Sequence, residues 1–251
     1  MTERKYTYRP DLPDKRDHYF RPALAAYPRF MDLRSSMTKI EDQGDLGSCT
    51  ANAAVALAEY LDFRKDRRYR NCSRLFVYYN ERVLEGSVGQ DSGAYIRDAI
   101  KAMARWGLCT ETAWPYVINK FRARPPAACF TAAAKHKALD YQRVNQTLDE
   151  LCSAIAEGFP VEFGFSVYES FETDAVARTG MVPVPQAGEA LLGGHAVAIA
   201  GYDLDHGLFI CRNSWGRDWG AKGYFYMPVN YVLDGDLAED FWIVRQFQGI
   251  K

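Results

Sequence analysis

The sequence lacks an excess of charge of either sign. Its 251 residues carry 31 Lys and Arg against 32 Asp and Glu, which gives a formal net charge of −1 at pH 7. A protein that binds nucleic acid through the phosphate backbone needs a basic surface that displaces counterions. The balanced composition offers none, so we expect no nucleic-acid partner.

Long apolar runs are also missing. No stretch of about 18 apolar residues occurs, the length that a membrane-spanning helix requires, so we expect no membrane partner. The first ten residues, MTERKYTYRP, lack the apolar segment of a secretory signal. A cytoplasmic location, export after trimming and export by another route all fit, and the compartment stays open.

Cysteine is sparse, and its spacing is not that of a metal site. Six cysteines, at positions 49, 72, 109, 129, 152 and 211, are too few for a disulfide scaffold in a chain of this length. No CxxC pair or Cys/His cluster is present, so we expect no metal and no cofactor. Cys109 and Cys129 flank a proline-containing loop and either pair in an oxidising compartment or stay free.

Two apolar periodicities divide the chain. Helical spacing predicts helices early in the sequence, with Ser73 as one N-cap and Gly107 as one stop, over residues 50–61, 73–83, 94–106 and, later, 148–157. Alternation predicts a half-buried strand over residues 161–168, and further strand-like runs stand at 195–202, 208–211, 223–227 and 241–244. This order favours an α+β fold in which a helical lobe meets a β lobe at a cleft.

Cys49 is the first candidate for chemistry. It opens the predicted helix, where unpaired backbone N–H groups and the helix dipole favour a thiolate. Taken alone it is more simply a buried structural cysteine, but the turn-forming run from Gly44 to Ser48 bends the chain tightly just before it. Gln43 lies across that bend. Its side-chain amide and the backbone N–H of Cys49 are suited to stabilise the oxyanion that forms when a thiolate attacks a carbonyl.

His195 and Asn213 complete a candidate triad. His195 follows two glycines and begins a predicted strand, and Asn213 follows the next strand. A regular hairpin centred on residue 204 would set the two side chains directly opposite each other on one face. The asparagine oxygen would then fix the imidazole tautomer, although a bulge would break this register.

These residues resemble the papain family of cysteine peptidases. Three blocks carry the resemblance: Gln43 with Gly47-Ser48-Cys49, Gly194-His195-Ala196-Val197, and Asn213-Ser214-Trp215-Gly216 with the following glycines. The order Cys, His, Asn and the distance of 146 residues from Cys49 to His195 fit that family. The resemblance covers about residues 32–244. It implies two lobes, the second resembling an antiparallel β-barrel, with a thiolate–imidazolium pair in the cleft.

The resemblance also assigns substrate contacts. It implies that Trp215 shields the Asn–His hydrogen bond from water, and that Ser92 and Gly93 form an edge that binds substrate backbone beside Gly194. An ordinary turn at residues 89–93 is the alternative. The chain departs from many members in having Leu46 where they have a cysteine and Thr50 where they have a tryptophan. The first departure removes the disulfide that is usual near the active site.

We divide the chain into residues 1–30, an extended arm, residues 31–115, a mainly helical lobe with Cys49, and residues 116–251, a mainly β lobe with His195 and Asn213. Four prolines suppress helix in the arm, and its aromatic residues can anchor it. The arm either crosses the cleft and regulates access or lies as a strap on the back of a lobe.

The leading interpretation is a monomeric cysteine endopeptidase acting on peptide or protein substrates through an acyl-enzyme. The alternative is a Cys–His acyl transferase or deconjugating hydrolase that acts on a protein partner, because the same triad serves both reactions. A third reading, a non-catalytic binding module, conflicts with the intact set of Gln43, Cys49, His195 and Asn213.

Overall fold

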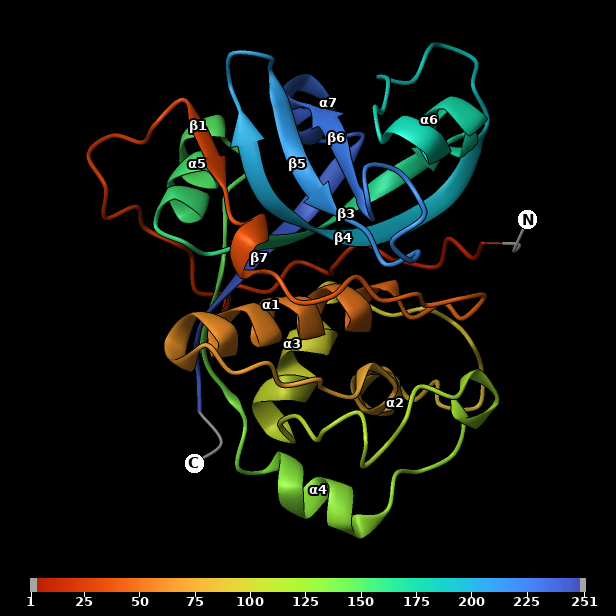
Figure 1. The fold of residues 1–251 in the computed structure, drawn as a ribbon. Coiled ribbons are helices and arrows are strands. Elements are labelled where there is room, and N and C mark those ends of the chain that lie inside the picture. Colours follow the sequence, from red (N-terminus) through yellow and green to blue (C-terminus); the bar gives the residue numbers. More distant parts are fainter. Residues whose placement is uncertain (1–3, 249–251) are drawn as a thin grey trace.

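The computed structural model describes residues 4–248. Its helices and strands form two lobes, with a sheet above and a group of helices below in Figure 1. The N-terminal segment, red in Figure 1, runs between them. Cys49 and His195 come from opposite sides of this boundary.

The helical lobe consists of α1 (Cys49–Asp66), α2 (Arg74–Glu85), α3 (Ile96–Arg105) and α4 (Ala127–Ala133). Helix α1 is buried on all sides from Cys49 to Tyr60 because α2 and α3 cover one side and strand β4 the other. Its run of alanines permits such close packing, since each side chain ends at Cβ, and alanine also favours helix most strongly. The nucleophile candidate therefore opens a helix held by both lobes.

The sheet is antiparallel and open, in the order β2-β7-β3-β4-β5-β6. A short strand β1 (Phe30–Asp32) pairs with β4 off this path. The other strands are β2 (Ala138–Arg143), β3 (Val161–Tyr168), β4 (Leu191–Asp203), β5 (Leu208–Arg212), β6 (Tyr224–Pro228) and β7 (Ala238–Phe247). Helices α5 (Leu148–Ala156), α6 (Asp174–Thr179) and α7 (Val229–Leu233) lie with the sheet in Figure 1. The expected barrel-like lobe is thus a sheet that does not close within residues 4–248.

The main predicted elements are confirmed, with differences at their ends. Ser73 caps α2 by accepting the Phe76 N–H at 3.1 Å, and β3 has the predicted bounds. The prediction that β3 is half-buried was wrong, because residues 161–165 are buried on both faces. Helices α1 and α5 both contact this strand, so its alternating sequence pattern does not mark one solvent-exposed face and one buried face.

The predicted hairpin register was also wrong. Strand β4 pairs Ala198 with Arg212 and Asp203 with Leu208, with an irregularity between Ile199 and Gly201. The hairpin is therefore centred beyond residue 205 rather than on 204, because residues 204–207 form the turn. His195 and Asn213 are not opposite partners, and only their side chains meet.

The division between the lobes at residue 115 stays a prediction. Cys129 and Ala133 of α4 lie in one hydrophobic cluster with residues of α1, α2 and α3, and that cluster also includes residues of β2, β4 and β7. The thiols of Cys109 and Cys129 are in contact there as free cysteines. Their pairing in an oxidising compartment stays a prediction.

The arm is extended over residues 4–29, and the first three of its expected residues lie outside the described range. Its first part, around Tyr8, lies at the lobe boundary, and a later part, around Phe20, is anchored in the sheet lobe. Phe20 is buried in the core of the sheet lobe, and Tyr19 forms an isolated β-bridge with Arg143 of β2.

In the part of the chain that the structure describes, no helix is long and apolar enough to cross a membrane. The same part contains no group of His, Cys, Asp and Glu suited to a metal ion.

Candidate active site

Cys49 occupies the first position of α1, directly after its N-cap residue Ser48 and four residues after the turn at Gly44 and Asp45. Its side chain is fully buried. The backbone N–H groups of Ala196 in β4 and of Thr50 in the first turn of α1 oppose the rise in its pKa that burial causes, so they lie near the sulfur. Ala196 follows His195 in sequence, so this contact brings the nucleophile candidate to the strand that carries the histidine.

His195 and Asn213 meet side chain to side chain, with Nε2 of the imidazole 2.9 Å from Oδ1 of the asparagine. That oxygen also accepts the backbone N–H of Ser214 at 2.9 Å, which identifies it as the acceptor of both bonds. Nε2 must therefore carry the ring proton, and Nδ1 is the unprotonated nitrogen. Among residues 4–248, Nδ1 has no hydrogen-bond partner.

Trp215 stacks on the imidazole, with ring centroids 4.9 Å apart and planes inclined by 23°. It is 4% exposed, and His195 is fully buried. A stacked indole excludes water from the histidine–asparagine bond and restricts rotation of the imidazole. This position agrees with the shielding role that the resemblance implies.

Burial governs the ionisation of both groups. It raises the pKa of the Cys49 thiol to about 12, because a thiolate loses its hydration there. It also lowers the pKa of His195 to about 4, an effect that the hydrogen bond to Asn213 opposes. Both shifts favour the uncharged forms, so in this conformation near neutral pH the pair is a thiol and a neutral imidazole.

Gln43 lies in the loop before α1 and is 2% exposed. Its Nε2 donates to the carbonyl of Leu46 at 2.9 Å, and its Oε1 accepts the hydroxyl of Ser214 at 2.6 Å. Its backbone N–H donates to the carbonyl of Ser214 at 2.8 Å. The amide is thus fixed in orientation between the nucleophile loop and the block that contains Asn213.

The three remaining predicted site residues behave differently. Gly93 and Gly194 lie on either side of the arm: a Cβ on Gly93 would stand 1.9 Å from the carbonyl oxygen of Thr7, and the carbonyl of Gly194 accepts the Tyr8 N–H at 3.0 Å. Ser92 instead bonds within its own loop, through its hydroxyl to that of Ser87 at 3.0 Å. The structure therefore brings the two glycines against the arm, whereas the serine hydroxyl is used within its own loop.

Residues of the arm fill the space between these glycines. Tyr6 makes edge contacts with His195 and Trp215, with ring centroids 6.3 and 6.2 Å apart. The guanidinium of Arg4 lies 4.9 Å from the Trp215 ring centroid. The Tyr8 ring occupies a slot at Gly164 of β3, where an added Cβ would stand 2.0 Å from the ring.

Several residues that support the loop before Cys49 were not identified from the sequence. Asp91 accepts the Gly47 N–H at 3.0 Å and a hydrogen bond from the Tyr78 hydroxyl. The hydroxyls of Ser48 and Tyr116 are 2.6 Å apart. Asp91 lies in the glycine-rich segment that the resemblance singled out, whereas Tyr116 had no signal because its partners are 68 and 73 positions away.

Comparisons with known proteins agree with this geometry. Residues 27–241 match the description "Papain family cysteine protease". An uncharacterized peptidase C1-like protein of Acanthamoeba polyphaga mimivirus is 39% identical over 97% of this chain and 87% of its own length. The thiol protease aleurain of Arabidopsis thaliana is 29% identical over 84% of this chain, which spans 58% of the length of aleurain.

The crystal structure of xylellain, a cysteine protease from Xylella fastidiosa, superimposes with a TM-score of 0.90 at 39% identity and covers 98% of both chains. Procathepsin L 3 from the larval midgut of Tenebrio molitor, at 19% identity and a TM-score of 0.73, shares the fold. The match to the family extends over most of the sequence and includes Cys49, His195 and Asn213. The chain is therefore a cysteine peptidase and belongs to the papain family.

Proposed function

We propose that the chain is an endopeptidase in which Cys49 is the nucleophile and His195 its base. Asn213 orients the imidazole, and Gln43 acts with the backbone N–H of Cys49 as the oxyanion donor pair. The observation that carries this proposal is the hydrogen bond between Nε2 of His195 and Oδ1 of Asn213, because it leaves Nδ1 as the nitrogen that can accept a proton.

The reaction follows from these positions. Nδ1 of His195 takes the thiol proton, and the thiolate attacks the carbonyl carbon of the peptide bond. The oxyanion accepts hydrogen bonds from Gln43 and Cys49 N–H, and His195 returns the proton to the departing amine as the acyl-enzyme forms. A water molecule, deprotonated by His195, then attacks the thioester and releases the acid and the thiol.

Substrate backbone is proposed to lie between Gly93 and Gly194. The support is that both glycines leave room for a main chain, and an arm residue forms a backbone hydrogen bond to Gly194. Trp215 is proposed to border this path and shield the triad. Ser92 is proposed to act only indirectly, by holding the loop that carries Gly93, since its hydroxyl bonds within that loop.

The arm is proposed to regulate access to this path. Residues 4–10 carry the contacts with Gly47, Gly93 and Gly194, and the thiol and imidazole are fully buried while these contacts exist. A segment in that position competes with substrate at high effective concentration because it is tethered. Its departure would also rehydrate Cys49 and His195, which favours transfer of the proton from sulfur to nitrogen.

The extent of the arm decides how to test it. Phe20 belongs to the core of the sheet lobe, so removal of residues 1–29 would expose apolar surface. A chain that begins at Asp11 keeps this anchor and loses only the part at the cleft. We expect this shorter chain to react faster than the full chain with an epoxysuccinyl inhibitor and to cleave a mixed peptide library faster.

The matched control is Cys49→Ala in both chains, which should abolish labelling and cleavage. Equal rates for the full and shortened chains, with unchanged circular dichroism, would refute regulation by the arm. Retained cleavage in Cys49→Ala would refute the nucleophile. Failure to cleave any library peptide, together with transfer to an amine or cleavage of isopeptide bonds, would instead indicate the acyl transferase or deconjugating alternative.

A further inference from the structure

Arg74 is a buried cation that the reaction above does not use. It is the first residue of α2, and its side chain is 7% exposed. The N-terminus of a helix disfavours a positive charge because the helix dipole is positive there. Burial of a guanidinium also removes its hydration. An arginine at this place therefore requires strong compensating contacts.

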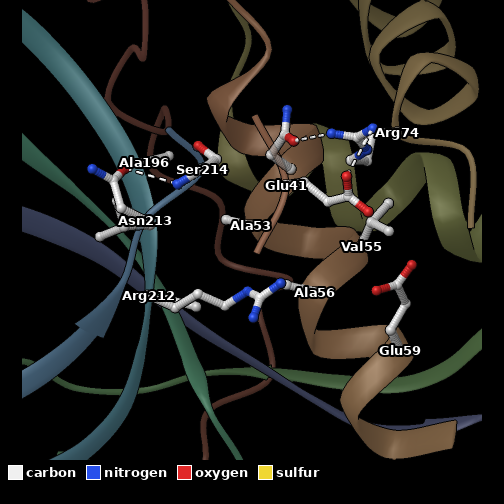
Figure 2. A pocket seen from close by; sticks show the side chains of 13 residues that line it. Glu41, Ala53, Val55, Ala56, Glu59, Arg74, Ala196, Arg212, Asn213 and Ser214 are labelled. Carbon is white, nitrogen blue, oxygen red and sulfur yellow. Dashed lines mark hydrogen bonds and ion pairs between the residues drawn. The ribbon is translucent and has the colours of Figure 1, made fainter. Parts of the chain in front are cut away.

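Those contacts come from three separate segments. Nη1 donates to Oδ1 of Asn52 at 3.2 Å, and Nη2 lies 3.4 Å from Glu41 and 3.7 Å from Glu111. The guanidinium carbon lies 4.2 Å from the ring centroid of Tyr116. Figure 2 shows Arg74 and Glu41 facing each other beside α1.

The cavity beside this cluster has a volume of about 10 Å³. A volume of that size holds about one water molecule and no organic ligand. Arg74, Glu41 and Asn213 all line it. The cluster therefore has no room to bind a substrate or effector, and its charges act on the residues around it.

The partners of Arg74 lead to both oxyanion donors. The Tyr116 hydroxyl donates to the carbonyl of Gln43 at 2.9 Å and lies 2.6 Å from the hydroxyl of Ser48. The side-chain amide of Asn52 donates to the carbonyl and hydroxyl of Ser48 at 2.9 and 3.0 Å. Ser48 precedes Cys49, whose backbone N–H is one donor, and Gln43 provides the other.

We propose that Arg74 is a positioning residue that fixes the two oxyanion donors relative to each other. It holds Tyr116 by its ring and Asn52 by its amide oxygen, and these two hold Gln43 and Ser48. The inference rests on the proposed function, because it needs an oxyanion at this site. Arg74 touches none of the reacting atoms and acts only through these neighbours.

The test compares two reactions of Cys49 in the full chain. Hydrolysis of a fluorogenic peptide amide forms an oxyanion, whereas alkylation by iodoacetamide attacks a saturated carbon and forms none. Both need the thiol to be accessible, so the ratio of kcat/KM to the second-order rate constant of alkylation cancels any change in how far the arm covers the thiol. Loss of one oxyanion donor costs about 10²–10³-fold in kcat, and displacement costs part of that.

We expect Arg74→Met to lower this ratio about tenfold or more, with KM nearly unchanged. Arg74→Lys keeps the charge without the planar fork and should lower it less. Tyr116→Phe removes only the hydroxyl link to Gln43 and Ser48 and should lower it in the same way. The control is Arg64→Met at the far end of α1, where Arg64 bonds to Gly158 and Tyr60, and its ratio should not change.

If Arg74→Met fails to fold, Arg74→Lys and Tyr116→Phe decide the question. Wild-type ratios in folded Arg74 and Tyr116 variants would overturn the positioning role while the proposed function stands. A wild-type chain that neither hydrolyses the amide nor alkylates at Cys49 would overturn both. A fall in the alkylation rate constant equal to the fall in kcat/KM would also overturn the inference, because the loss would then concern the thiol and not the oxyanion.

Discussion

The hydroxyl of Tyr8 in the arm donates a 2.6 Å hydrogen bond to Asp240 of β7, 232 positions further along the chain. Asp240 has a backbone φ of 58°, in the left-handed region that a non-glycine residue rarely adopts. Its carboxylate also accepts the backbone N–H of Asp11 at 2.5 Å and pairs with Arg143. One buried carboxylate, on a residue with a left-handed backbone, thus joins the arm to the last strand of the sheet.

Displacement of Tyr8 is predicted to release the arm. Tyr8→Ala removes a buried ring and its hydrogen bond, and loss of a buried aromatic side chain costs about 3 kcal/mol or more. We expect alkylation of Cys49 in the full chain to become at least about tenfold faster. Gly164→Ala should act in the same direction, since its Cβ would meet the Tyr8 ring. Tyr19→Ala, at an exposed arm residue, is the control and should leave the rate unchanged.

The attachment of the arm is predicted to weaken as pH rises from about 4 to about 7. Burial, and then the neighbouring carboxylate of Asp240, raises the pKa of Asp11 from 3.8 to about 7, against the opposing charge of Arg97. The attached arm therefore binds a proton that a free arm has already released. Its attachment is strongest below pH 4 and weakens until the pH passes about 7.

The measurement is the alkylation rate of the full chain divided by that of the chain starting at Asp11, which cancels titration of the thiol. This ratio should rise between pH 4 and pH 7. Asp11→Asn keeps the shape of the side chain but cannot titrate, so its ratio should be flat over that range. The same rise in Asp11→Asn would show that Asp11 is not the group responsible.

The ionisation of the Cys49–His195 pair is predicted to depend on the arm. Burial keeps the thiol pKa near 12 and the imidazole pKa near 4, so the full chain at pH 7 should show little thiolate absorbance near 240 nm. The chain starting at Asp11 should show a thiolate signal at pH 7 that is absent from its Cys49→Ala version. Equal thiolate signals in both chains would show that the arm does not affect the ionisation of the pair.

The supporting residues are predicted to differ in their effect on kcat. His195→Ala removes the group that transfers protons, which contributes about 10²–10⁴-fold in such reactions. Asn213→Ala keeps the base but loses the bond that selects its tautomer, so we expect a smaller fall. Steady-state kinetics on one peptide amide measures both. An asparagine variant as inactive as the histidine variant would show that orientation alone is an inadequate account of Asn213.

Local patterns were sufficient for the elements that hold the site. Helix propensity and periodicity located α1 and α2, and the turn before Cys49 together with the blocks around His195 and Asn213 pointed to one family. Short elements such as α4 and α7 were missed because five to seven residues carry too little periodic signal. The hairpin register failed because the turn occupies residues 204–207, which moves its centre beyond residue 205, and the irregularity between Ile199 and Gly201 shifts the pairing again.

The sequence by itself determined which residues can perform thiol chemistry, because the types Cys, His, Asn and Gln and their order are properties of the chain. The tertiary structure alone decided what surrounds them. The ionisation of Cys49 and His195 depends on burial between two lobes, and the contacts of Tyr8 with Asp240 and of Arg74 with Glu41 and Tyr116 join segments far apart in sequence. Desolvation and long-range hydrogen bonds arise only when such segments pack together, so no local pattern encodes them.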